Sequence, residues 1–140
     1  MYLASNFTPE IQGAEIADPE SAVLVAEHQE QGGKAELIGF SFLIQGRAPP
    51  EVRGEAAMEI RRFYVSHAWH GRGVAGALMG RTLDAARERG ASTAWLGVWE
   101  HNPRAIAFYE KHGFEHVGEH EFVLGADIQT DWLMARALRR

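Results

Sequence analysis

The chain has 140 residues, 46% of them hydrophobic and 24% charged, which are globular values that do not indicate disorder. This length suits one domain, residues 1–140, with a sizeable core. Cysteine is absent, which excludes disulfides, thiolate metal sites and a cysteine nucleophile. The net charge of −5 argues against a general nucleic-acid binder, which is normally basic, and is compatible with a cationic small-molecule partner.

No segment of the sequence predicts export or membrane insertion. The first residues lack a basic region followed by an apolar core. The longest mostly apolar run, residues 37–44, is far shorter than the ~20 residues that cross a bilayer. We therefore expect a soluble cytoplasmic protein without a membrane partner.

The first half of the chain predicts three strands. Residues 22–27 and 36–45 predict a hairpin with a turn at residues 31–34. A third strand covers about residues 56–65 and follows a loop that contains two consecutive prolines.

The alternation of apolar side chains in this third strand has a fault. Met58 and Ile60 share one face, but Phe63 and Val65 are out of phase with them. An extra residue near positions 61–62 would restore the alternation, which is what a β-bulge does. A strand buried on both faces would also lose its alternation, so both interpretations stay open.

A helical period replaces the strand pattern over residues 71–89. Its apolar stripe comprises Val74, Ala75, Leu78, Met79, Thr82, Leu83 and Ala86. Gly90 follows, as glycine often does just past the end of a helix.

The remaining elements are one more helix and three more strands. Residues 93–99 predict a strand, and Asn102 and Pro103 look like the N-cap and first residue of a helix that stops at Gly113. Two closing strands are expected at 115–124 and 129–138. The expected fold is α/β (α+β), with a mixed, mostly antiparallel central sheet flanked by helices.

A glycine-rich segment, residues 70–75, joins the third strand to the first helix. Small residues let a ligand approach the backbone, and the free N–H groups of a first helical turn form an anion site with the helix dipole. A pyrophosphate is the natural ligand, and Arg72 could add a charge-assisted contact. A glycine-rich helix start that binds nothing is the alternative for this motif alone.

The same glycines also spell the dinucleotide fingerprint G-x-G-x-x-G at Gly71, Gly73 and Gly76, with Glu100 near the expected acidic position. In that fold the first glycine follows its strand almost directly, whereas residues 66–70 intervene here. The repeated strand–helix alternation of a doubly wound sheet is also missing. A nicotinamide oxidoreductase is therefore the weaker interpretation.

A second motif occupies residues 102–114. Its aromatic and small residues at helical spacing would, on their own, more often belong to a core than to a site. Together with residues 70–75 they resemble the GCN5-related N-acetyltransferase (GNAT) superfamily. The family's signature Gln/Arg-x-x-Gly-x-Gly/Ala is matched from His70 to Ala75, and Asn-x-x-Ala-x-x-Phe-Tyr-x-x-x-Gly-Phe from Asn102 to Phe114. The resemblance covers roughly residues 22–138.

The resemblance implies acetyl-coenzyme A (acetyl-CoA) as co-substrate and no metal. The backbone of residues 63–65 would pair with the pantetheine arm. A bulge would separate the neighbouring strands and make room for this arm. The amides of residues 71–75 would hold the pyrophosphate, and Asn102 would face the cofactor arm. The implied cofactor contacts are Phe63, Tyr64, Val65, His70, Gly71, Arg72, Gly73, Val74, Ala75, Asn102, Ala105, Phe108 and Tyr109.

The resemblance also places Tyr109 near the thioester sulfur as general acid. A tyrosine hydroxyl gives the departing thiolate a proton without bringing a charge into an apolar slot, and such transfer is typically worth ~10²–10⁴ in rate. A core tyrosine is the alternative. Glu59, at the start of the central strand, is the candidate base through a water molecule, with a surface carboxylate as its alternative. The candidate substrate-binding residues are Glu59, Tyr64 and Trp99.

Two features depart from the family pattern. His70 stands where glutamine or arginine is usual, which affects side-chain contacts at the pyrophosphate but not the amide cradle. Family members generally begin with a strand and one or two helices, whereas about twenty residues precede the strand at Ala22 here, and residues 1–7 resemble the end of a helix. We expect the first strand and most of these helices to be absent, which would expose apolar surface and favour a homodimer.

The histidines do not predict a metal site. His116 and His120 share a strand face but lie ~13 Å apart at 3.3 Å per residue. His67 and His70 have no carboxylate or H-E-x-x-H context.

The sequence thus predicts an N-acetyltransferase that moves acetyl from acetyl-CoA to a primary amine of a small molecule. Residues 122–134 are similar to the tail of a bacterial branch that includes polyamine acetyltransferases, and the acidic charge agrees with a polyamine. An amino-sugar drug, an amino acid, a protein N-terminus or a lysine are alternatives. A module that senses acyl-CoA without turnover is a second hypothesis: the short N-terminus favours it, whereas Tyr109 and Asn102 favour an enzyme.

Overall fold

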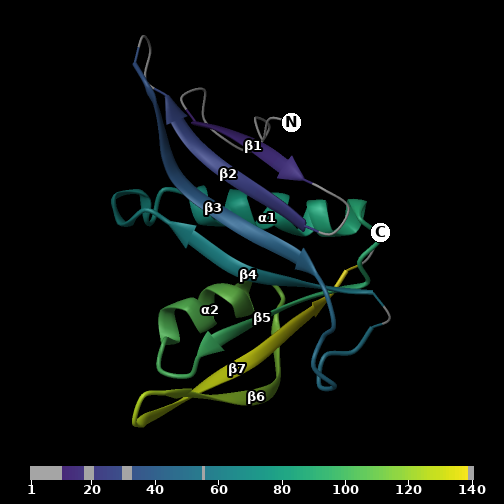
Figure 1. Cartoon of the computed structure of the whole chain (residues 1–140). Helices are drawn as coiled ribbons and strands as arrows, with labels where there is room; N and C mark the ends of the chain where they lie inside the picture. The colour runs from purple at the N-terminus through teal and green to yellow at the C-terminus, as the bar shows by residue number, and fades with distance from the viewer. Residues whose placement is uncertain (1–10, 18–20, 30–32, 55, 139–140) are drawn as a thin grey trace.

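One mixed sheet of seven strands organises the chain, in the order β1-β2-β3-β4-β5-β7-β6 (Figure 1). This computed structural model describes residues 11–17, 21–29, 33–54 and 56–138. The strands are β1 (Ile11–Ala17), β2 (Ser21–Gln29), β3 (Ala35–Gln45), β4 (Ala57–Val65), β5 (Thr93–Trp99), β6 (Glu115–Leu124) and β7 (Asp127–Ala137). All neighbouring strands are antiparallel except β4 and β5, which confirms the expected fold class.

The parallel contact between β4 and β5 is short. Only residues 57–59 of β4 pair with residues 93–95 of β5, and beyond them the strands diverge (Figure 1). The sheet therefore opens into a V, and the rest of β4 presents one edge without a strand partner.

A β-bulge lies in β4 at the mouth of this V. In the register with β3, Phe42 pairs with Arg62 and Leu43 with Ile60, so Arg61 is the extra residue. The fault in the apolar alternation predicted this bulge, and the prediction is confirmed.

Both α-helices, α1 (Val74–Glu88) and α2 (Pro103–Lys111), lie on one face of the sheet, which we call the helix face. Ser41 and Phe63 are register partners and therefore share a face. Ser41 is hydrogen-bonded to Thr82 of α1 (2.7 Å), and Phe63 contacts Phe108 of α2, with ring centroids 5.6 Å apart. No α-helix of the described residues covers the opposite face, which we call the open face.

Capping residues, proline and glycine set where the two helices begin and end. The side-chain Oδ1 of Asn102 accepts a hydrogen bond from the Ala105 N–H (3.3 Å), and Pro103 is the first residue of α2, as the sequence predicted. Gly113 follows α2 with φ +89°. The first helix begins at Val74 rather than Gly71, because Gly73 has a φ of +84° that interrupts the helical backbone.

Strand β1 was not predicted. Residues 11–17 pair antiparallel with β2 and form one edge of the sheet, although we expected no strand ahead of Ala22. The expected helix end at residues 1–7 lies outside the described residues, as do residues 31–32 of the expected turn. In the part of the chain that the structure describes, no helix is long and apolar enough to cross a membrane.

Candidate active site

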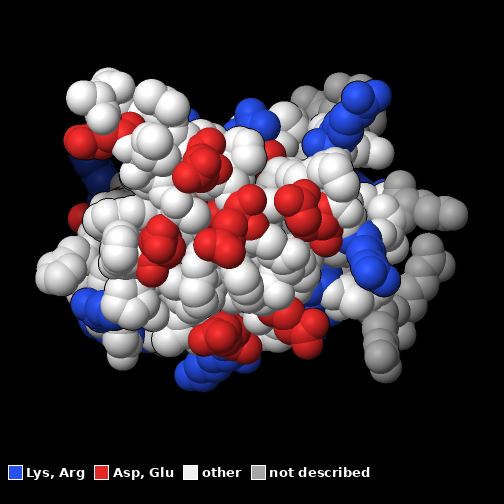
Figure 2. Space-filling view, turned by 90° about the horizontal axis from the view of Figure 1, so that it is seen from below, with Lys and Arg blue, Asp and Glu red and all other residues white. Residues whose placement is uncertain are grey.

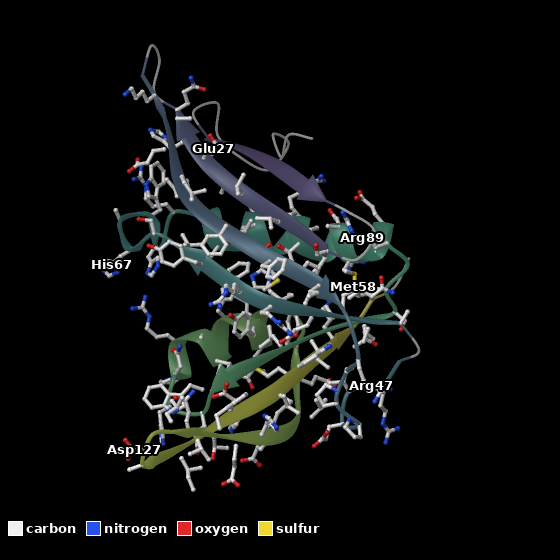
Figure 3. The ribbon with its side chains drawn as sticks, viewed as in Figure 1. Glu27, Arg47, Met58, His67, Arg89 and Asp127 are labelled. Carbon is white, nitrogen blue, oxygen red and sulfur yellow. The ribbon has the colours of Figure 1, made fainter. Side chains whose placement is uncertain are left out.

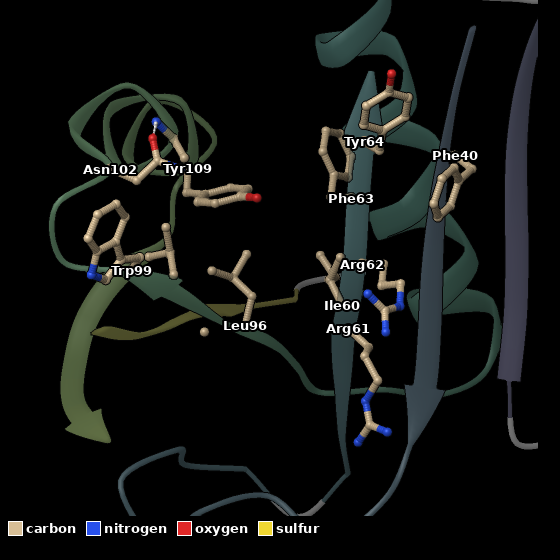
Figure 4. A pocket seen from close by; sticks show the side chains of 13 residues that line it. Phe40, Ile60, Arg61, Arg62, Phe63, Tyr64, Leu96, Trp99, Asn102 and Tyr109 are labelled. Carbon is tan, nitrogen blue, oxygen red and sulfur yellow. Dashed lines mark hydrogen bonds between the residues drawn. The ribbon is translucent and has the colours of Figure 1, made fainter. Parts of the chain in front are cut away.

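A cleft of about 550 Å³ occupies the gap where β4 and β5 diverge, and we call it the first cleft (Figure 4). Strand residues supply most of its wall, and the beginning of α2 closes one side. Its lining residues are Phe40, Ile60, Arg61, Arg62, Phe63, Tyr64, Leu96, Gly97, Val98, Trp99, Asn102, Ala105 and Tyr109. Residues of strand β4 and of the second sequence motif, residues 102–114, thus meet around one space, whereas residues 70–75 of the glycine-rich motif do not line it.

Tyr109 projects from α2 into this gap, toward β4 (Figure 4). Its ring is packed edge-on against Phe63 and Phe114, with centroids 6.4 and 5.9 Å away. Burial raises the pKa of the Tyr109 phenol above its usual value of 10.0, so the hydroxyl is protonated at neutral pH. Among the described residues its hydroxyl has no hydrogen-bond partner, which leaves the proton free for a ligand.

The other α2 residues named by the motif have different positions. Asn102 lines the first cleft while its Oδ1 caps the helix, so its side-chain NH2 group is the part that can face a ligand. Ala105 lines the cleft one turn before Tyr109. Phe108 packs between Phe63 and His112 and does not line the cleft.

The glycine-rich loop before α1 has the geometry of an anion cradle. Gly71 and Gly73 have φ angles of +74° and +84°, which L side chains rarely adopt. A Cβ at either position would meet no atom within 4 Å, so backbone conformation and not crowding requires glycine there. The first helical hydrogen bond runs from the Ala77 N–H to the Gly73 carbonyl, which leaves the N–H groups of Val74 and Ala75 without helical partners.

The side chains of this loop make internal contacts. The ring Nε2 of His70 donates to the Val65 carbonyl (2.8 Å), which ties the loop to the end of β4. The Arg72 guanidinium lies over the Trp69 ring, 4.1 Å from its centroid. His70 therefore supports the cradle and is already engaged, while Arg72 is exposed beside it.

A second cleft, of about 670 Å³, adjoins the first and shares Ile60, Arg61 and Gly97 with it. Its lining is more charged and comes from five segments: Arg47, Pro49, Pro50, Glu51, Glu59, Ile60, Arg61, Trp95, Gly97, His120, Phe122, Asp131 and Leu133. Arg47 marks the loop between β3 and β4, and Asp127 marks the tip of the β6–β7 hairpin (Figure 3).

Glu59 lines the second cleft and not the first. Its Oε1 accepts hydrogen bonds from Arg61 at 3.0 and 3.3 Å, and its side chain is 21% exposed. The structure therefore does not bring Glu59 and Tyr109 into the same cleft, although the clefts adjoin at Ile60 and Gly97.

The two aromatic residues expected at the acceptor both line the first cleft. Tyr64 is 53% exposed and lies beside Phe40, with ring centroids 5.8 Å apart. Trp99 is 46% exposed and contacts His101 edge-on at 5.3 Å. In the described part of the chain, no group of three or more His, Asp or Glu side chains could hold a metal ion.

Known proteins share this sequence and architecture. Residues 3–114 match the sequence profile of the acetyltransferase (GNAT) family. The chain belongs to this family. An uncharacterized N-acetyltransferase of Mycobacterium tuberculosis (strain H37Rv) is 36% identical over 123 residues, which are 88% of this chain and 71% of that protein.

Two acetyltransferases with named acceptors are also similar. The streptothricin acetyltransferase of Streptomyces lavendulae is 33% identical over 106 residues, 76% of this chain and 51% of that protein. The crystal structure of nourseothricin acetyltransferase aligns with a TM-score of 0.70 and 26% identity, over 95% of this chain and 74% of that one. GNAT enzymes are acetyl-CoA-dependent, so this GNAT chain is an N-acetyltransferase by family.

Sequence reasoning did not find several residues of the two clefts in this acetyltransferase. Leu96, Gly97 and Asp131 were not singled out, because none of them belongs to a local motif. Their place depends on how β5 pairs with β7, whose register partners are 32 (131 − 99) to 44 (137 − 93) residues apart in the chain, and that register is not visible in either segment alone.

Proposed function

We propose that this acetyltransferase moves the acetyl group of acetyl-CoA to a primary amine of a small molecule, with polyamine-like acceptors favoured, by direct attack and with Tyr109 as general acid. One observation carries the proposal. The Tyr109 hydroxyl, kept protonated by burial, points into the gap where β4 and β5 diverge.

The free edge of β4 and the glycine loop are suited to hold the cofactor. On that edge, backbone groups of residues 63–65 other than the Val65 carbonyl, which accepts from His70, have no strand partner and can bond to the amides of a pantetheine arm. The N–H groups of Val74 and Ala75, with Gly71 and Gly73 before them, can bind the pyrophosphate at the positive end of α1. Arg72, exposed beside the loop, can add a charge-assisted contact.

The reaction needs three proton transfers. The acceptor ammonium loses one proton before its nitrogen attacks the thioester carbon, and Glu59 takes that proton through a water molecule. After the attack the nitrogen, now bonded to the acetyl carbon, loses a second proton to solvent. As the carbon–sulfur bond breaks, Tyr109 donates its proton to the departing thiolate, and the phenol is restored from solvent. The acceptor reaches the thioester through the second cleft, because this cleft shares Gly97 with the first cleft and is lined by Glu59.

Charge supports a cationic acceptor. Seen from the β6 side, acidic side chains lie across the middle of the molecule and basic ones mostly near its rim (Figure 2). Strand β6 contributes exposed carboxylates at Glu115 and Glu119. Such a surface raises the local concentration of cations and speeds their association. The streptothricin and nourseothricin acetyltransferases among its relatives are named for small-molecule acceptors.

The test is thermal stability with acetyl-CoA, coenzyme A and NAD, followed by thiol release across polyamines, amino sugars, amino acids and short peptides with a free N-terminus. We expect stabilisation by both coenzyme A species and not by NAD, and turnover with polyamines. Turnover on peptides alone would replace the small-molecule proposal with N-terminal acetylation. Binding without turnover on any amine would indicate an acyl-CoA sensor.

A further inference from the structure

Asp131 lies at the junction of the two clefts. It pairs with Trp99 of β5 in the antiparallel register, and it lines the second cleft. Its Oδ2 lies 3.7 Å from the point that a Cβ on Gly97 would occupy. Because Gly97 has no side chain and lines both clefts, this carboxylate faces the passage between them.

The carboxylate of Asp131 is oriented but not neutralised. The Gln129 side-chain amide donates to Oδ1 at 2.8 Å, and both residues are part-buried. Among the described residues no lysine or arginine forms an ion pair with Asp131. Its register partner on β6, His120, contacts Phe122 instead, with ring centroids 4.7 Å apart.

The other carboxylates of this cleft are engaged differently. Glu59 is paired with Arg61 at 3.0 Å. The stem of Glu51 lies against Gly118, where its Cγ is only 2.8 Å from the point that a Cβ would occupy. Asp131 is therefore the carboxylate of the second cleft that lies beside Gly97 and, among the described residues, has no lysine or arginine partner.

We propose that Asp131 binds a second, non-reacting ammonium group of the acceptor, so that the second cleft selects diamines and polyamines over monoamines. This inference rests on the proposed acetylation of a small amine and names the residue that sets its specificity. A carboxylate paired with the reacting ammonium would hold it protonated and unable to attack. A non-reacting ammonium carries no such constraint, and its ion pair positions the far amine at the thioester.

The experiment compares two acceptors of equal chain length, 1,4-diaminobutane and 4-amino-1-butanol, by thiol release at saturating acetyl-CoA. The wild type should prefer the diamine in kcat/KM. Asp131→Asn should raise KM for the diamine roughly 10- to 100-fold, the range for a hydrogen bond to a charged group, while kcat stays similar. The same variant should leave KM for the amino alcohol nearly unchanged, so the preference is lost.

Two further variants separate recognition from general effects. Asp131→Glu should keep part of the preference, because it keeps the charge. Glu121→Gln makes the same charge change on the same hairpin, but position 121 lies one residue beyond the His120–Asp131 pair and faces the other side of the sheet. It should change KM by about twofold at most, the effect of an exposed charge.

The outcomes distinguish this inference from the proposed function. A wild type that acetylates both acceptors equally, or an Asp131→Asn variant that keeps the diamine preference, would overturn the role of Asp131 and leave the acetyltransferase proposal intact. An equal loss of kcat on both acceptors would also overturn it, since that result assigns Asp131 to the chemistry. Acetyl-CoA binding by a wild type that acetylates no amine would instead contradict the proposed function.

Discussion

The first cleft is lined mostly by aromatic and apolar side chains, with Arg61 and Arg62 of β4, whereas the second draws its lining from five segments and includes five charged side chains, Arg47, Glu51, Glu59, Arg61 and Asp131. The first takes Asn102, Ala105 and Tyr109 from the motif of helix α2. The second forms only when the loop after β3 and the β6–β7 hairpin meet β4 and β5. This difference suggests that the cofactor half is set by short motifs, while the acceptor half can change its charges without disturbing the cofactor site.

Replacing Tyr109 with phenylalanine should have the largest effect on activity. The variant keeps the packing against Phe63 and Phe114 but loses the proton donor, so kcat should fall roughly 10²–10⁴-fold. Thiol release measures this, and the thermal shift with coenzyme A serves as the folding control. A kcat within a factor of about two of wild type would assign Tyr109 to the core and remove the catalytic role of the first cleft.

Glu59→Gln tests whether the second cleft also takes part in the chemistry. If Glu59 is the base through a water molecule, kcat should fall about 10²-fold, at the lower end of the range for positioned proton transfer. The matched variant Arg61→Met removes the ion-pair partner and keeps the carboxylate. A similar loss in both variants would mean that the ion pair, and not a base, is what the reaction needs.

Gly73→Ala should weaken the cofactor site and leave the second cleft intact. The backbone at +84° disfavours a side chain by roughly 1–2 kcal/mol, which would distort the amide cradle and lower acetyl-CoA affinity about tenfold. Isothermal titration with coenzyme A measures the change. Gly80→Ala, inside α1 and with no atom near its Cβ position, is the control that should not weaken binding.

The smallest expected effect is on stability and concerns His112, which follows α2 and contacts Phe108. Burial, and then the positive charges of Lys111 and Arg136, lower the pKa of the His112 imidazole. Below pH ~6.5 the unfolded chain therefore binds this proton more readily than the folded one, so stability falls as the pH drops below that value. His112→Gln should flatten this slope in thermal unfolding between pH 7 and 5. An unchanged slope would place its origin in other groups.

The sequence was most informative where structure depends on neighbours along the chain. The phase fault between Ile60 and Phe63 predicted the bulge at Arg61, and Asn102-Pro103 predicted the start of α2, because bulges and caps involve adjacent residues. Strand β1 was missed, because its place depends on pairing with β2.

The residues of the second cleft were less predictable, because their positions depend on pairing between strands that are distant in the sequence. Asp131 acquires its position from the pairing of β5 with β7, and the Gln129 side chain occupies its Oδ1. Glu59 was singled out as a base near the thioester, but the structure places it in the second cleft with Arg61 as partner. The cofactor contact expected of His70 stays a prediction, and the bond from its ring to the Val65 carbonyl, five residues earlier, was not foreseen.

The short parallel contact between β4 and β5 also affects how fast backbone amides exchange with solvent. Beyond residue 59, amides of β4 that point away from β3 have no strand partner, so their hydrogens should exchange with deuterated water rapidly in the free protein. A cofactor arm bonded along that edge would slow the exchange. This stretch of β4 is therefore a built-in reporter of cofactor occupancy, readable by mass spectrometry without any acceptor amine.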